Sequence, residues 1–110
     1  MASDPEFARF VLEQLRELGD VSHRRMFGEY AIYVRGKVVA LICDNELYLK
    51  PTAAGRALLG TPVEAPPFPG AKQYFVVGEY LDDPAFLAEL FRATEAEVEP
   101  PKRKGRRRKE

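Results

Sequence analysis

The sequence contains few of the reactive side chains that enzymes commonly use for catalysis. Its 110 residues include one cysteine, one histidine and no tryptophan. A single cysteine excludes an intrachain disulfide framework and any zinc or iron–sulfur site built from several cysteines. The longest uninterrupted apolar run has six residues, 38–43, whereas a membrane-spanning helix needs about 18. The N-terminus lacks the basic and apolar stretches of a secretory signal, so we expect a cytoplasmic protein with no membrane association.

The two most reactive side chains are not placed for catalysis. A cysteine nucleophile needs an exposed, electropositive site that lowers its pKa, but Cys43 ends the apolar run and is expected to be a small buried residue. His23 lies at the start of a predicted strand, where a surface or capping role is expected. An enzyme using either residue is the alternative, and we expect that replacing both residues by alanine leaves any biochemical phenotype unchanged.

Metal and nucleotide patterns are missing as well. Asp82 and Asp83 are explained as a helix cap, and Asp44 and Glu46 flank a predicted hairpin turn. The glycines do not match either nucleotide-binding fingerprint. We therefore predict no enzymatic activity, no catalytic residues, no metal site and no cofactor.

The net charge of zero conceals a strong asymmetry along the chain. Residues 1–101 contain ten basic and sixteen acidic residues, whereas residues 102–110 contain seven basic residues and one acidic residue. An acidic domain over 1–99 is thus followed by a basic tail over 100–110, which has no apolar side chain except proline and is predicted to be disordered. The basic residues of the tail are Lys102, Arg103, Lys104, Arg106, Arg107, Arg108 and Lys109.

Apolar spacing, capping residues and turn signals predict seven elements. In chain order they are a helix over 4–18, strands over 29–34, 37–43 and 46–50, a helix over 51–59, a strand over 72–80, and a helix that begins at 82 or 83 and ends before 100. The dipeptides Arg35-Gly36 and Asp44-Asn45 are predicted as hairpin turns. Segment 21–27 either extends the first strand or forms an edge strand, and the four prolines of 61–71 predict an extended loop.

The order α-β(3)-α-β-α predicts an α+β fold with two layers. The strands do not alternate with crossover helices, so the sheet should be antiparallel with the helices packed on one face. Segment 37–43 is apolar at nearly every position, which favours a central strand covered on both sides.

The segment 24–30, RRMFGEY, is the most unusual in the chain. In one interpretation Met26 and Phe27 fill the gap between helix and sheet, and the two arginines are solvated. In the other, Arg24 and Arg25 belong to a basic surface for a partner, and they point to opposite faces if the segment is extended.

Three motifs in order, RRMFGEY at 24–30, LYLKPT at 47–52 and PPFPGAK at 66–72, resemble the N-terminal domain of the TfoX/Sxy family. The resemblance covers most of residues 5–98 and implies a two-layer α+β fold of the secretion-chaperone-like type. It also implies a role in regulating transcription and competence for DNA uptake in bacteria, and no catalytic residues. Glu29 and Ala31 stand where the family often has glycines. We expect a stand-alone N-terminal module.

Two non-enzymatic functions follow. The first is a regulatory module that acts by protein contacts, with the tail residues binding nucleic-acid phosphates without sequence preference. The second is a chaperone-like homodimer that binds protein and has no role with nucleic acid. The tail could instead contact the acidic domain or remain solvated, and the sequence leaves these alternatives open.

Overall fold

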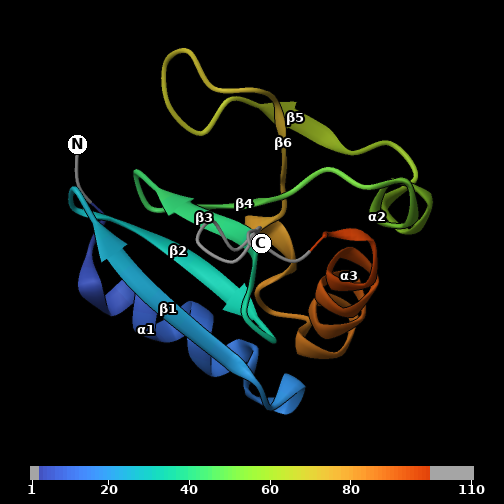
Figure 1. Ribbon diagram of the computed structural model, residues 1–110, viewed down its shortest axis with the longest axis horizontal. Coiled ribbons are helices and arrows are strands. Elements are labelled where there is room, and N and C mark those ends of the chain that lie inside the picture. The colour runs from blue at the N-terminus through green and yellow to red at the C-terminus, as the bar shows by residue number, and fades with distance from the viewer. Residues whose placement is uncertain (1–2, 100–110) are drawn as a thin grey trace, which may run out of the picture.

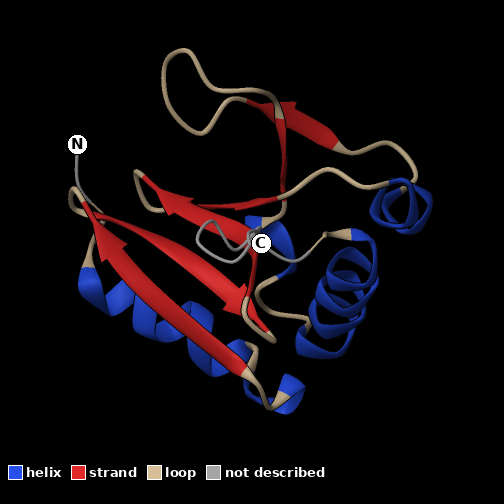
Figure 2. Ribbon diagram, viewed as in Figure 1, coloured by secondary structure: helices blue, strands red, loops and turns tan. Residues whose placement is uncertain are grey.

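The computed structural model describes residues 3–99, which form three α-helices, two 3-10 helices and six strands (Figures 1 and 2). In chain order these are α1 (Pro5–Gln14), η1 (Arg16–Leu18), β1 (Val21–Met26), β2 (Glu29–Val34), β3 (Lys37–Cys43), β4 (Glu46–Leu49), α2 (Ala53–Leu59), β5 (Val63–Ala65), β6 (Tyr74–Val76), η2 (Gly78–Tyr80) and α3 (Pro84–Glu97). No helix in this part of the chain is long and apolar enough to cross a membrane.

Each α-helix begins at a side-chain cap. The side chains of Asp4, Thr52 and Asp83 each accept a hydrogen bond from a backbone N–H two or three residues later, at 3.0–3.3 Å. These bonds satisfy N–H groups that have no partner inside the helix. The predicted start of α1 is therefore confirmed, and of the two aspartates considered for α3 it is Asp83 that caps the helix. Helix α2 begins at Ala53, two residues after the predicted start, because Thr52 is its cap.

Strands β1 to β4 form an antiparallel meander joined by three two-residue turns. All three turns have positive φ angles, from +53° at Phe27 to +81° at the glycines of the first two turns. Positive φ at both central positions defines the type I′ turn, whose twist matches that of the flanking strands. The turns predicted at Arg35-Gly36 and Asp44-Asn45 are confirmed, and segment 21–27 forms a separate edge strand and the start of a third turn.

The sheet has the order β1-β2-β3-β4-β6-β5, so β1 and β5 are its edges. Consecutive strand pairs are antiparallel, and Figure 1 shows α1 behind β1 and β2, with α2 beside α3 at the other end of the sheet. The α+β class predicted from the sequence is confirmed.

The hydrophobic core lies between α1, α3 and one face of the sheet. The register places Ile32, Ala40 and Leu49 across from one another on this face, and all three are buried. Helices α1 and α3 contribute Val11, Leu87, Leu90 and Phe91, and the junction between α1 and η1 contributes Leu15; each is fully buried. Because side chains alternate along a strand, the intervening residues lie on the opposite face. We call this second face the open face; it carries Ala31, Tyr33, Leu41, Cys43 and Tyr48.

The structure corrects the prediction in three places. The predicted loop 61–71 contains β5, because Val63, Glu64 and Ala65 pair with β6 along the sheet edge, where proline can flank a strand. The predicted strand 72–80 is shorter and ends in η2, where Gly78 begins a 3-10 turn. The predicted first helix is α-helical only to Gln14 and continues as η1 after Leu15.

Candidate partner-binding surface

The tip of the β1–β2 hairpin presents an aromatic side chain to solvent. Phe27 is 100% exposed and has a φ of +53°, a region that bulky L-residues rarely occupy because Cβ approaches backbone atoms. Its neighbour Met26 is 43% exposed. The interpretation in which Met26 and Phe27 fill a gap between helix and sheet is therefore wrong, since the turn directs Phe27 outward.

The hairpin tip continues into an apolar groove on the open face, with a volume of about 890 Å³. Its lining includes Leu41 and Cys43 from β3, Met26 and Phe27 from the tip, and Pro67 and Phe68 from the loop between β5 and β6. Phe68 is 53% exposed although it lies beside other apolar groups. Adjacent exposed apolar side chains of this kind are typical of surfaces that bind a partner.

One end of the groove is acidic and held by hydrogen bonds. The Glu29 carboxylate accepts hydrogen bonds from the backbone N–H of Asp44, at 3.2 and 3.3 Å, and from the Ser3 hydroxyl. The Ser3 hydroxyl oxygen in turn accepts a hydrogen bond from the N–H of Asn45 at 3.1 Å. These bonds connect the N-terminal segment to two hairpin turns and keep this end of the groove in place.

Cys43 lines the groove but is not activated as a nucleophile. Burial, together with the negative charges of Glu29 and Asp44, raises the pKa of its thiol from 9.0 to about 11. The thiol is therefore protonated at neutral pH, which is the opposite of what a catalytic cysteine requires.

His23 cannot assist Cys43, because the two residues lie on opposite faces of the sheet and β2 separates their strands. Its ring lies 6.1 Å from that of Tyr30, centroid to centroid. This arrangement supports the predicted surface role of His23.

Arg24 and Arg25 lie side by side on the exposed edge strand β1. The register pairs Arg24 with Ala31 and Arg25 with Tyr30, so the two guanidinium groups extend to opposite faces. Arg25 lies over the Tyr30 ring at 5.9 Å. The salt bridges among residues 3–99 involve Arg35, Lys37 and Arg56, so neither β1 arginine has a carboxylate partner there.

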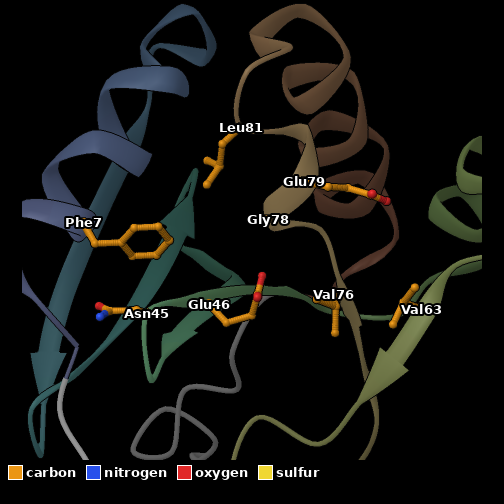
Figure 3. A pocket seen from close by; sticks show the side chains of 8 residues that line it. All are labelled: Phe7, Asn45, Glu46, Val63, Val76, Gly78, Glu79 and Leu81. Atoms are coloured by element: carbon orange, nitrogen blue, oxygen red, sulfur yellow. The ribbon is translucent and has the colours of Figure 1, made fainter.

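A second, smaller hollow lies between α1 and the segment that leads to η2 (Figure 3). The Glu46 side chain points toward Gly78, whereas the Glu79 carboxylate points away from it. A Cβ at position 78 would overlap the Glu46 carboxylate as it is placed here, so this carboxylate packs directly against the Gly78 backbone. The two carboxylates thus do not converge on a common point, and the hollow lacks the geometry of a general acid–base pair.

Residues 3–99 contain no group of three or more side chains able to hold a metal ion. The predicted nucleic-acid-binding residues of the tail, and the predicted disorder of 100–110, lie outside the described part of the chain.

Sequence reasoning missed the surface role of Phe27 and Phe68. Two sequence features indicate their exposure. Residues 27–28 form an X-Gly dipeptide, as the predicted turn at 35–36 does, and residue 68 is an aromatic residue between prolines.

These features define a small α+β domain with an exposed edge strand, β1, and an apolar groove on the open face. Residues 13–98 match the model of the TfoX N-terminal domain, and the chain belongs to this family. It is also 43% identical, over 102 residues, to an uncharacterised 12.7 kDa protein from the trpE 5′ region of Spirochaeta aurantia; the match covers 93% of this chain and 89% of that protein.

Proposed function

We propose that this chain is a non-enzymatic regulatory module that acts by binding another protein, in the control of transcription or competence. Membership of the TfoX N-terminal family supports the regulatory role. The observation that carries the binding role is Phe27, fully exposed in an unfavourable backbone conformation beside the apolar groove. Strained, exposed residues are retained where they contribute to function.

The proposed partner contact uses the groove, and the tail adds a second, electrostatic contact. The seven basic residues of 102–109 can neutralise nucleic-acid phosphates and release counterions. This gives sequence-independent binding with a dissociation constant of roughly 10⁻⁴ to 10⁻⁶ M at physiological salt, and a slope of log K against log salt of about −6 if all seven charges engage duplex DNA.

Two measurements on the full chain test these contacts separately. Co-purification from the native cell, with and without nuclease, should recover a stoichiometric protein that is lost in Phe27→Asp. Recovery that is equal for the wild type and Phe27→Asp would overturn the groove as the binding site.

DNA titrations at two salt concentrations, with the full chain and with residues 1–99, should show binding only with the tail. Equal affinities of the two chains for DNA would eliminate tethering by the tail.

A chaperone-like homodimer is the second candidate, and the apolar open face is the observation that favours it. In this case two copies would bury the groove against each other. Sedimentation velocity distinguishes the two functions, because the homodimer requires a species of twice the chain mass that Phe27→Asp converts to monomer. A monomer at all concentrations would eliminate this candidate.

A further inference from the structure

The outer edge of β1 carries unpaired backbone groups in a defined pattern. The N–H of Arg35 donates to the carbonyl of Asp20 at 3.0 Å, and these two residues continue the β1–β2 register. Hydrogen-bonded and non-bonded pairs alternate along an antiparallel ladder. The backbone groups of Val21, His23 and Arg25 therefore point away from β2, where the described chain provides no further strand.

This edge lacks the common structural protections of sheet edges. Over its six residues β1 has no proline and no break in register, and five of its side chains are exposed. Proteins often protect such edges with charge, and Arg24 and Arg25 serve that purpose against other basic strands. An exposed edge of this length can accept an added strand through main-chain hydrogen bonds.

The charges on β1 select which strand can be added. Antiparallel pairing of two β1 strands must match outward-facing backbone groups, which centres the contact on Ser22, His23 or Arg24. Centred on Arg24, the pair places Arg24 opposite its own copy, and like charges facing across strands are destabilising. Centred on His23 or on Ser22, it leaves Arg25 opposite an uncharged residue. No register of two β1 strands thus gives both arginines a carboxylate, whereas consecutive acidic residues of a partner would meet both, one on each face.

The apolar groove begins where β1 ends. Met26 is the last residue of β1 and also lines the groove, next to Phe27. A strand added antiparallel to β1 would start near this tip and run toward Val21. Its first residues therefore lie at the groove, and the residues that follow lie opposite Arg25 and then Arg24.

We propose that β1 binds an extended acidic segment of a partner protein by antiparallel strand addition, with a bulky apolar residue of that segment entering the groove at Phe27. The inference rests on the proposed protein-binding function and specifies the partner's chemistry. Main-chain bonds at Val21, His23 and Arg25 would supply affinity, and the arginines and the groove would supply specificity.

A synthetic peptide tests this arrangement with the full chain. The terminally blocked heptapeptide TFEEVTV places its phenylalanine opposite Met26, on the face that carries the groove, and its glutamates opposite Arg25 and Arg24. Its binding should slow hydrogen exchange at the amides of Val21, His23 and Arg25, measured by NMR, by at least about tenfold at saturation. The peptide TFKKVTV should bind at least about tenfold more weakly, which corresponds to about 1.4 kcal/mol.

Two matched pairs separate strand addition from simple charge attraction. N-methylation of the first valine, opposite His23, removes a main-chain donor and should weaken binding about tenfold, whereas N-methylation of the second threonine, whose N–H points outward, should not. The variant Arg24→Glu/Arg25→Glu should reverse the preference between the two peptides. The control Arg56→Glu/Arg92→Glu, at two exposed arginines on α2 and α3 at the other end of the sheet, should leave it unchanged.

Equal effects of the two N-methyl groups, or no protection at the three amides at saturating peptide, would overturn strand addition at β1. These outcomes are independent of the proposed function. A native partner that is lost in Phe27→Asp but retained in Arg24→Glu/Arg25→Glu would leave the regulatory module intact and reject this inference alone.

Discussion

Two hairpins of the same turn type differ in how the molecule holds them. The β3–β4 turn uses Asp44 and Asn45, and its backbone and side chains bond to Ser3, Asp4 and Glu29. The β1–β2 turn is held by one such bond, from the Ser3 N–H to the Gly28 carbonyl at 3.0 Å. It has the same positive φ at its first position but places an exposed phenylalanine there. The anchored turn follows the residue preferences of type I′ turns, whereas the exposed turn departs from them. The difference is consistent with our proposal that the β1–β2 hairpin contacts a partner, whereas the β3–β4 hairpin follows the ordinary rules of a stable turn.

The largest expected difference in stability between the two hairpins lies in their strands. Leu47 in β4 is fully buried in the core, so Leu47→Ala should lower the free energy of unfolding by about 3 kcal/mol through lost burial and an unfilled cavity. Met26→Ala in β1 removes a side chain that is 43% exposed and should cost less than about 1 kcal/mol. Urea denaturation of both variants measures the loss in free energy of unfolding. Equal losses would show that β1 is as firmly packed as β4.

Cys43, which precedes the anchored turn, provides a pH test. Its thiol pKa is raised from 9.0 to about 11, so the folded state disfavours the thiolate. The thiol of the unfolded chain ionises at lower pH than that of the folded chain. The contribution of the protonated thiol to folding stability is therefore fully present below pH 9 and is lost as the pH rises from about 9 toward 11. Alkylation by iodoacetamide at pH 8 should be about a hundredfold slower than for a free cysteine. Cys43→Ser should abolish labelling, and a rate equal to that of free cysteine would contradict the raised pKa.

The anchored turn itself should be sensitive to Asn45. The Asn45 Oδ1 accepts a hydrogen bond from the Asp4 N–H at 2.8 Å, and its φ is +59°. Asn45→Ala removes that bond and places a β-carbon in the left-handed region, so unfolding should become easier by about 1–2 kcal/mol. Phe27→Ala is the matched control in the exposed turn, where alanine is as strained as phenylalanine; its free energy of unfolding should change little.

The smallest expected change has the opposite sign. Phe27→Asn replaces a strained, fully exposed residue with one that tolerates positive φ, so the protein should become more stable by about 0.5–1 kcal/mol while partner capture falls. Phe27→Leu retains the strain and should not stabilise. Thermal melts report stability and co-purification reports capture. A destabilised Phe27→Asn protein would show that Phe27 packs against the fold and is not held for a partner.

Much of the architecture was predictable because local rules decide it. Helix caps at Asp4, Thr52 and Asp83, and the turns at 35–36 and 44–45, depend on residues near one another in the sequence. The short strand β5 was not predictable, because its three residues pair with β6 across a proline-rich loop. The exposed state of Phe27 was missed for a related reason: apolar residues are expected inside, and the turn that directs this one outward spans only two residues.

The sequence by itself determined the α+β class, the meander of strands and the two adjacent arginines at 24 and 25. These depend on residue type and on spacing over a few positions. Only the tertiary structure decided that β1 lies at an edge with one side unpaired, that Phe27 is fully exposed, and that Phe68 joins Met26 and Leu41 in one groove. A binding surface of this kind assembles residues from distant parts of the chain, and their proximity exists only after the sheet has paired.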